Sequence, residues 1–167
     1  MSIPETIDLP GVLCKMPAAR YDPARFPGMM VNLQNPKSTV LLFGSGKIIS
    51  TGTKSIAQTK MTLTAILEIL QRLGYRTGKT RIRIENIVAS VSYGRCIDLE
   101  RCAQVLPKSM YEPEQFPAVF HRMGDPPATT LIYKTGRLIC TGLNTQHKVF
   151  AAASKMNRLL AQHDLFC

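Results

Sequence analysis

The sequence has no tryptophan, few acidic residues and no long apolar segment. Its 11 Asp and Glu face 21 Lys and Arg, which gives a formal net charge of +10 at pH 7. Such an excess attracts polyanions, with nucleic acid as the first candidate and an anionic membrane surface as the second. The basic residues are scattered among strand-like segments and do not follow one amphipathic helix, which favours nucleic acid. Charge alone also fits a solvated basic face with no polyanionic partner.

No apolar run approaches the roughly 18 residues of a membrane span, and no secretory signal opens the chain. The cysteines are odd in number, form no Cys-x-x-Cys pair and are not spaced with the three histidines as metal ligands. We therefore expect buried or idle thiols, no metal, and a reducing, intracellular compartment. The cysteines are Cys14, Cys96, Cys102, Cys140 and Cys167.

Signatures of catalysis are also missing. The run GSGK from Gly44 to Lys47 superficially resembles a phosphate-binding loop, but Leu41 stands where that motif needs glycine and Ile48 where it needs serine or threonine. Neither paired carboxylates nor a Ser/His/Asp set is spaced for chemistry. The sequence thus predicts a protein that is not an enzyme and uses no cofactor. Its 45% hydrophobic and 19% charged residues are typical of a chain that folds around a core.

What the sequence does contain is an internal repeat with an offset of 90 residues. The segment YDP at 21–23, followed by Phe26, recurs as YEP at 111–113, followed by Phe116. The same offset relates IDL at 7–9 to IDL at 97–99, so the copies align without an insertion or deletion. We divide the chain into repeats at 1–77 and 78–167.

Each repeat is expected to contain a helix, three or four strands and then a longer helix. Residues 39–43 and 48–51 are short β-branched and aliphatic runs joined by a glycine-rich turn, and 129–133 and 138–141 repeat this hairpin. A basic connector at 76–81 is followed by an expected strand over 82–91.

Both faces of the predicted hairpin are apolar. Alternation places Thr39, Leu41 and Phe43 on one face and Val40 and Leu42 on the other. The last segment of each repeat has apolar residues at helical spacing, which we expect to cover one face: Leu63, Ile66, Leu70 and Leu73, then Val149, Ala153, Met156 and Leu160. The opposite face, with Phe43 and its counterpart Tyr133, is then free for a large, flat ligand.

Three segments resemble the TATA-box-binding protein family. They are YEPEQFP at 111–117, LLFGSGK at 41–47 with Thr51-Gly52, and RIENIV at 83–88, within a resemblance that extends over roughly residues 7 to 165. It implies an α+β fold of two pseudo-symmetric repeats, a saddle whose curved antiparallel sheet has a concave, DNA-facing side and helices on its convex side. It also implies a general transcription initiation factor that binds A·T-rich promoter DNA in the minor groove and bends it.

In this family, aromatic wedges enter the base stack at both ends of the DNA site. The resemblance assigns this role to Phe26 and Phe43 in the first repeat and to Phe116 and Tyr133 in the second, with the same spacing of 17 residues in each pair. Tyr133 departs from the phenylalanine of the family, and burying its hydroxyl between bases is costly unless the hydroxyl finds a partner. We expect a weaker kink at that end.

The resemblance also assigns the remaining DNA contacts. Apolar contacts in the minor groove are implied for Leu41, Ile49, Val88, Leu131 and Ile139, and hydrogen bonds to base edges for Thr51, Asn86 and Thr141. Contacts to the DNA backbone are implied for Ser45, Lys47, Arg122, Thr135 and Arg137. Asn32 replaces the arginine that the family has at the first-repeat counterpart of Arg122, which removes one expected phosphate contact.

One protein partner follows from the same resemblance. Glu112 and Glu114 match acidic positions with which the family holds a TFIIB-type initiation factor, whereas binding of a TFIIA-type factor near Asp22 is left open. The expected location is the nucleus, or the cytoplasm for an archaeal or viral source. The alternative reading is a related scaffold or regulator with weakened or lost TATA specificity that acts through protein contacts.

The opening strand of the first repeat has no residues to occupy, because the counterpart of Asn86 would precede Met1. Truncation, a strand supplied by a neighbour and a natively incomplete sheet are three open explanations. Where the edge is left unpaired, it would favour self-association.

Overall fold

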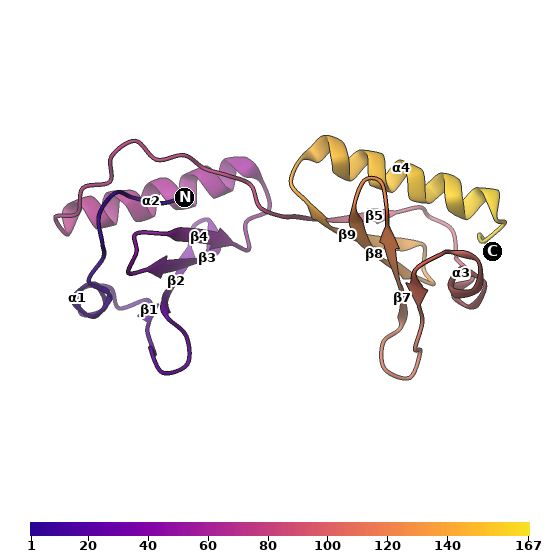
Figure 1. The fold of residues 1–167 in the computed structure, drawn as a ribbon, viewed down its shortest axis with the longest axis horizontal. Helices are drawn as coiled ribbons and strands as arrows, with labels where there is room; N and C mark the ends of the chain where they lie inside the picture. Colours follow the sequence, from indigo (N-terminus) through magenta and orange to yellow (C-terminus); the bar gives the residue numbers. More distant parts are fainter. The chain divides into compact units, whose positions relative to one another are not determined.

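The computed structural model describes residues 1–167 as two compact units, Met1–Arg83 and Ile84–Cys167. Each unit combines an antiparallel sheet with a long helix that lies along one side of it (Figure 1). The α+β class built from two repeats, expected from the sequence, is confirmed. The compact units divide after Arg83, slightly later than the repeat boundary that the sequence suggested between residues 77 and 78.

The first unit has a four-stranded sheet in the order β1-β2-β3-β4. Its long helix α2 buries Leu63, Ile66 and Leu70 in the same core as Val40 and Leu42 of the sheet. Its elements are α1 (Leu9–Leu13), β1 (Ala19–Arg20), β2 (Gly28–Gln34), β3 (Lys37–Phe43), β4 (Ile48–Thr51) and α2 (Ile56–Arg72).

The second unit has a five-stranded sheet in the order β5-β9-β8-β7-β6. Its long helix α4 buries Val149, Met156 and Leu160 against Ile132 and Leu138 of the sheet. Its elements are β5 (Ile87–Ser92), α3 (Leu99–Val105), β6 (Ser109–Met110), β7 (Ala118–Met123), β8 (Ala128–Tyr133), β9 (Arg137–Leu143) and α4 (Gln146–Gln162).

The hairpin turns between β3 and β4 and between β8 and β9 require glycine. Gly46 has a φ of 78° and Gly136 a φ of 81°, a left-handed conformation that a residue with a Cβ rarely adopts. A Cβ on Gly46 would also lie 2.6 Å from the Glu5 carbonyl oxygen, because the N-terminal segment runs beside the turn. Both predicted hairpins are confirmed, and their registers are equivalent: Leu41 faces Ile49 as Leu131 faces Ile139.

Each long helix begins at a side-chain cap. The Ser55 hydroxyl accepts a hydrogen bond from the Gln58 backbone N–H, and the Thr145 hydroxyl accepts one from the Lys148 N–H. The predicted apolar stripes all pack on the core; Leu73, the C-cap of α2, is partly exposed at its edge. No helix is both long and apolar enough to span a bilayer.

One expectation differs from the structure. The strand expected over 82–91 begins at Ile87, because the Asn86 side chain accepts a hydrogen bond from the Gly142 N–H at 2.8 Å, in the place of a backbone partner. The strands of each unit are described as a sheet of their own. In the second unit β9 pairs with β5. Its counterpart in the first unit, β4, is an edge strand that pairs with Met1–Ile3 only at its beginning.

The thiols are all free of disulfides. Cys102 and Cys140 are buried in the core of the second unit, and the other three cysteines are exposed. No group of three or more His, Cys, Asp and Glu side chains is arranged to hold a metal ion.

Candidate nucleic-acid interface

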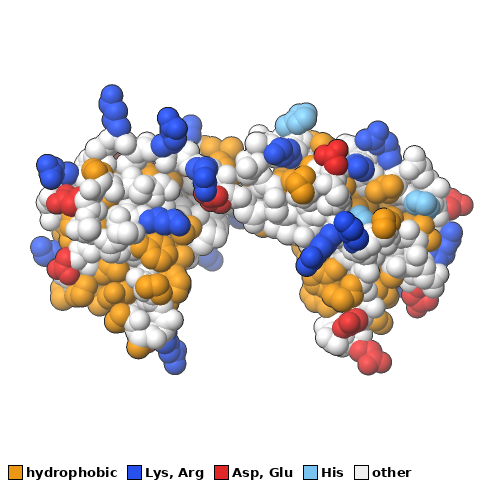
Figure 2. Space-filling model, in the orientation of Figure 1, with side chains coloured by type: hydrophobic (Ala, Val, Ile, Leu, Met, Phe, Trp, Pro, Cys, Tyr) orange, Lys and Arg blue, Asp and Glu red, His pale blue; other side chains and the backbone are white.

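The sheet of each unit has one face against its long helix and one face open. In β3, Val40 and Leu42 are fully buried while Leu41 and Phe43 are partly exposed, as the alternation predicted. Figure 2 shows hydrophobic side chains gathered on each unit on the side away from its long helix. The open faces carry three successive rows of side chains, which are aromatic, apolar and polar.

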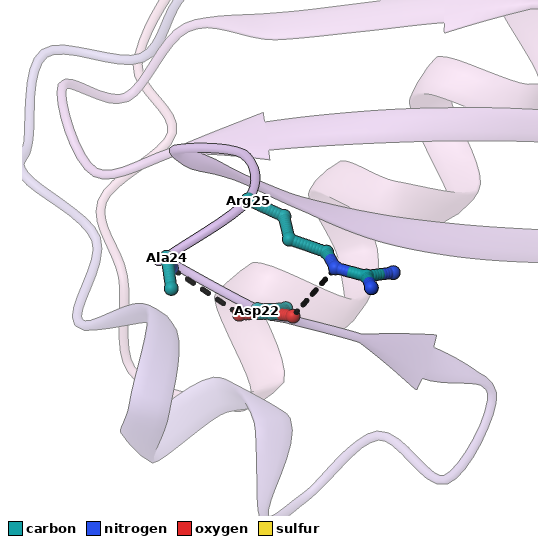
Figure 3. A network of polar contacts seen from close by, with 3 residues as sticks. All are labelled: Asp22, Ala24 and Arg25. Atoms are coloured by element: carbon teal, nitrogen blue, oxygen red, sulfur yellow. Dashed lines mark hydrogen bonds and ion pairs between the residues drawn. The ribbon is translucent and has the colours of Figure 1, made fainter.

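The aromatic row begins at a tight turn. In the first unit the Asp22 carbonyl accepts hydrogen bonds from the Arg25 and Phe26 N–H groups, and the Asp22 carboxylate accepts one from the Ala24 N–H at 3.2 Å and lies 3.8 Å from Arg25 Nε (Figure 3). In the second unit the Glu112 carbonyl accepts from the Phe116 N–H at 2.9 Å. These turns fix where the chain delivers Phe26 and Phe116 to the open faces.

Phe26 and Phe43 form an edge-to-face pair in the first unit. Their ring centroids are 5.8 Å apart with an interplanar angle of 67°. The rings lie over Gly28, which pairs with Phe43 in the β2–β3 register. Phe26 is 42% exposed, so a large part of an apolar ring is available to a ligand.

The second unit brings together the equivalent residues and one more. The Phe116 ring is 6.2 Å from Tyr133 and 5.2 Å from Phe120, centroid to centroid. Ala118 takes the place of Gly28 and is 1% exposed beneath these rings. The four aromatic residues that the sequence singled out thus lie as two pairs, one on each open face.

The apolar row lies next to the aromatic one. Met30, Leu41 and Ile49 are cross-strand neighbours in the first unit, and Phe120, Leu131 and Ile139 are their counterparts in the second. Val88 on β5 is 66% exposed. A row of aliphatic and aromatic side chains with this exposure can contact sugar and base edges without desolvating a charge.

The polar row contains asparagine and threonine. In the first unit the Thr39 hydroxyl donates to Asn32 Oδ1 at 2.9 Å, and Thr39 pairs with Thr51 across β3 and β4. In the second unit Asn86 Nδ2 and Thr141 Oγ1 are 3.2 Å apart. Both arrangements leave exposed amide and hydroxyl groups that can donate to or accept from base edges.

Basic and hydroxyl side chains border the open faces. Ser45 and Lys47 are exposed in the β3–β4 turn, as are Thr135 and Arg137 at the β8–β9 turn. Arg137 Nε donates to the Ser90 hydroxyl at 3.0 Å, which directs the guanidinium along the face of the second sheet. The remaining predicted backbone contact, Arg122, is exposed on β7 in the polar row opposite Thr129.

The loop between β6 and β7 has the opposite charge. It contains Glu112 and Glu114, both exposed, and Figure 2 shows acidic side chains at the end of this loop in the second unit. The equivalent loop of the first unit contains Asp22 and Arg25, which lie next to each other and cancel in charge. The two loops therefore offer different surfaces to a partner.

Sequence reasoning missed several residues of the open faces. Met30 and Phe120 complete the apolar row, Thr129 completes the polar row of the second unit, and Gly28 lies under the first aromatic pair. The alternation that identified the faces of β3 could have found Met30 and Phe120 if it had been applied to β2 and β7. Gly28 could not be found in this way, because its importance comes from the two rings above it.

Comparison with known proteins gives concordant results for sequence and structure. Residues 1–73 and 81–163 match the family model described as "Transcription factor TFIID (or TATA-binding protein, TBP)". A TATA-box-binding protein of Pyrodictium occultum is 38% identical over 157 residues, which cover 93% of this chain and 79% of the relative. One from Sulfolobus acidocaldarius is 36% identical over 165 residues, covering 98% of this chain and 84% of the relative.

Among solved structures, the chain is similar to the TBP of Methanococcus jannaschii. The TM-score is 0.90 at 32% sequence identity, and the match covers 96% of this chain and 93% of that structure.

Proposed function

The chain belongs to the TATA-binding protein family, and on that premise we propose that it is a transcription initiation factor that binds A·T-rich promoter DNA in the minor groove. This is a family of DNA-binding transcription factors and not of enzymes. The observation that carries the proposal is the pair of open sheet faces, each with an aromatic, an apolar and a polar row at equivalent register positions.

The chemistry of these rows suits the minor groove. That groove presents mainly acceptor atoms at A·T pairs and adds the amino group of guanine at G·C pairs. Apolar residues such as Leu41 and Leu131 would pack closely against A·T edges and leave the guanine amino group without a partner. Asn86, Thr51 and Thr141, in the polar row of each unit, would supply a small number of hydrogen bonds to base edges.

The aromatic pairs would bend the DNA. In minor-groove proteins of this family, apolar side chains inserted between base steps unstack them and kink the duplex. Phe26 and Phe43 are partly exposed apolar rings held on a sheet, which is the geometry that such a wedge needs. Phe116 and Tyr133 would form the second wedge. Ser45, Lys47, Arg122, Thr135 and Arg137 would hold the phosphates and sugars on either side.

The charge of the loop before β7 supports a protein partner. Glu112 and Glu114 are exposed acids in an otherwise basic protein, and we assign them to binding a TFIIB-type factor. The relatives named above come from archaea, whose cells lack a nucleus, so we place the protein in the cytoplasm if its source is archaeal as well.

The experiment is a titration of an A·T-rich duplex and a G·C-rich duplex of equal length at one fixed salt concentration, with end-to-end fluorescence transfer to report bending. We expect selective, bent binding to the A·T-rich duplex, and a loss of affinity of at least about tenfold for Phe43→Ala. Phe150→Ala is the matched control, because Phe150 is 72% exposed on α4 and away from the open face. Equal, unbent binding to both duplexes would contradict the proposal.

Asn32 and Tyr133 favour a second candidate, a family member that works as a scaffold through protein contacts. Asn32 supplies no positive charge where Arg122 does in the second unit, and its Oδ1 is engaged by Thr39. The Tyr133 hydroxyl makes insertion between bases more costly. Unselective DNA binding together with stable capture of a TFIIB-type factor would identify this function.

The partner assignment has its own test, a gel shift with a purified TFIIB-type factor and the A·T-rich duplex. We expect the double variant Glu112→Gln/Glu114→Gln to bind DNA like the wild type but to form the ternary complex weakly. An unchanged ternary complex would remove these two residues from the partner site.

A further inference from the structure

The two aromatic wedges are built differently. In the first unit Phe26 and Phe43 contact each other, and no third aromatic ring joins them. The next residue on the open face of β2 is Met30, which is 40% exposed. In the second unit, Phe116 contacts both Tyr133 and Phe120, so the wedge is a cluster of three rings.

Two sequence differences account for this. A methyl group on Gly28 would lie 2.6 Å from Phe26 Cε1 and 3.0 Å from Phe43 Cε1, so the first pair needs the bare backbone beneath it. Ala118 carries that methyl group, and Phe116 cannot take the position that Phe26 takes over Gly28. Its ring is instead 5.2 Å from Phe120 at an interplanar angle of 44°.

Phe120 is well placed to hold Phe116. It is partly exposed on β7 opposite Leu131, and its own position is fixed by the strand pairing. A ring supported by two others, Phe120 and Tyr133, has fewer directions in which to move than a ring with one neighbour. Pre-ordering of this kind lowers the entropy that a binding surface loses when it meets its ligand.

On the basis of the function proposed above, we propose that Phe120 is a positioning residue for the second wedge: the rings that enter the DNA there are Phe116 and Tyr133, and Phe120 is a third ring that holds Phe116 in place. Phe120 acts on DNA binding through Phe116. The support from Phe120 offsets part of the cost of the Tyr133 hydroxyl at the same end of the site.

A double-mutant cycle on affinity for the A·T-rich duplex tests this role. Phe120→Met gives the second unit the residue that the first unit has at this position. We expect it to weaken binding by about two- to tenfold, the range of an aromatic pair. In a Phe116→Ala background the same change should have little effect, whereas in a Phe26→Ala background it should keep its full effect.

The cycle separates positioning from two simpler roles. If Phe120 only stabilised the unit or only touched DNA by itself, Phe120→Met would weaken binding by the same factor in all three backgrounds, and that result would overturn the proposal. No effect of Phe120→Met on wild-type affinity would also overturn it. Phe150→Met is the control for the chemical change at an exposed site on α4.

The double variant Gly28→Ala/Met30→Phe keeps the proposal testable if Phe120→Met does not fold, because it gives the first unit both residues that distinguish the second wedge, and Met30 is 40% exposed. Compared with Gly28→Ala alone, the added ring should tighten binding, and the gain should vanish in a Phe26→Ala background. A gain that persists there, or no gain, contradicts the mechanism. If the wild-type protein shows no preference for the A·T-rich duplex, the proposed function fails as well. If the wild type prefers that duplex but the effects of the Phe120 and Phe116 substitutions simply add, only the role of Phe120 fails.

Discussion

At the scale of single residues, small differences between equivalent positions decide what each half can do. Gly28 and Ala118 differ by one methyl group, and together with the exchange of Met30 for Phe120 this group separates an isolated ring pair from a three-ring cluster. Asn32 and Arg122 differ by a charge at the same place in the polar row. The repeat therefore preserves the backbone while the side chains of the open faces diverge.

Gly28→Ala should separate DNA binding from stability. The new methyl group displaces the ends of the Phe26 and Phe43 rings, so we expect affinity for the A·T-rich duplex to fall several-fold. The free energy of unfolding should stay level or rise by up to about 1 kcal/mol, because alanine restricts the unfolded chain. Urea unfolding and a duplex titration of the same sample measure both quantities. Unchanged affinity would show that the ring positions are not critical.

His121 should make stability depend on pH. Burial in the second unit, where the ring is 4% exposed, lowers the pKa of His121 below its ordinary value near 6.5. The unfolded state then binds the proton more readily, so stability is fully present above about pH 6.5 and is lost as the pH falls towards the folded-state pKa. Urea unfolding at a series of pH values should show a smaller loss for His121→Gln than for the wild type. Equal losses would assign the pH dependence to other groups.

At the scale of elements, the long helices stabilise the sheets by packing on the side opposite the open faces. α4 buries Val149, Met156 and Leu160 against the second sheet, and its first turn is capped by Thr145. Changes in this helix should therefore act on stability and leave the residues of the open face in place.

Thr145→Ala should lower the free energy of unfolding by about 1 kcal/mol, because the Lys148 N–H loses its partner at the helix N-terminus. Thr145→Ser keeps the hydroxyl and should retain most of the stability. Chemical denaturation of the three proteins measures the difference, and a duplex titration should give the same affinity for all of them. A weaker affinity for Thr145→Ala would mean that α4 and the open face are coupled.

At the scale of the whole molecule, the net charge of +10 adds a sequence-independent attraction to DNA. Both units contribute to it, since each carries a basic residue at its hairpin turn, Lys47 in one and Arg137 in the other. This attraction does not depend on base sequence, so under the proposed function the preference for A·T pairs has to come from the apolar rows.

Removing a phosphate contact should change how binding responds to salt. For Lys47→Ala and Arg137→Ala we expect the slope of log affinity against log salt concentration to become shallower by about one each. Arg72→Ala is the control, because Arg72 lies in the last turn of α2. Titrations at several salt concentrations give the slopes. Equal slopes for all four proteins would remove Lys47 and Arg137 from the DNA backbone contacts.

The sequence by itself determined the repeat, the hairpins and the faces of their strands. Alternation in Leu41–Phe43 and the helical spacing of Leu63, Ile66 and Leu70 are local patterns, and the elements they predict are the ones observed. The turn glycines can also be predicted from the sequence, because a residue in the left-handed conformation between two apolar strands is usually glycine. The resemblance identified the family from the same segments.

Only the tertiary structure decided which side chains meet across strands. That β5 begins only after Asn86, whose side chain accepts a hydrogen bond from Gly142, depends on contacts between residues distant in the chain. The same is true of Phe116, which packs against both Phe120 and Tyr133. Such contacts depend on the strand register and on the room that small residues such as Gly28 leave for the rings above them. Neither is encoded in a local sequence pattern. The three rows of the open faces exist because β2, β3 and β4 place their exposed residues side by side.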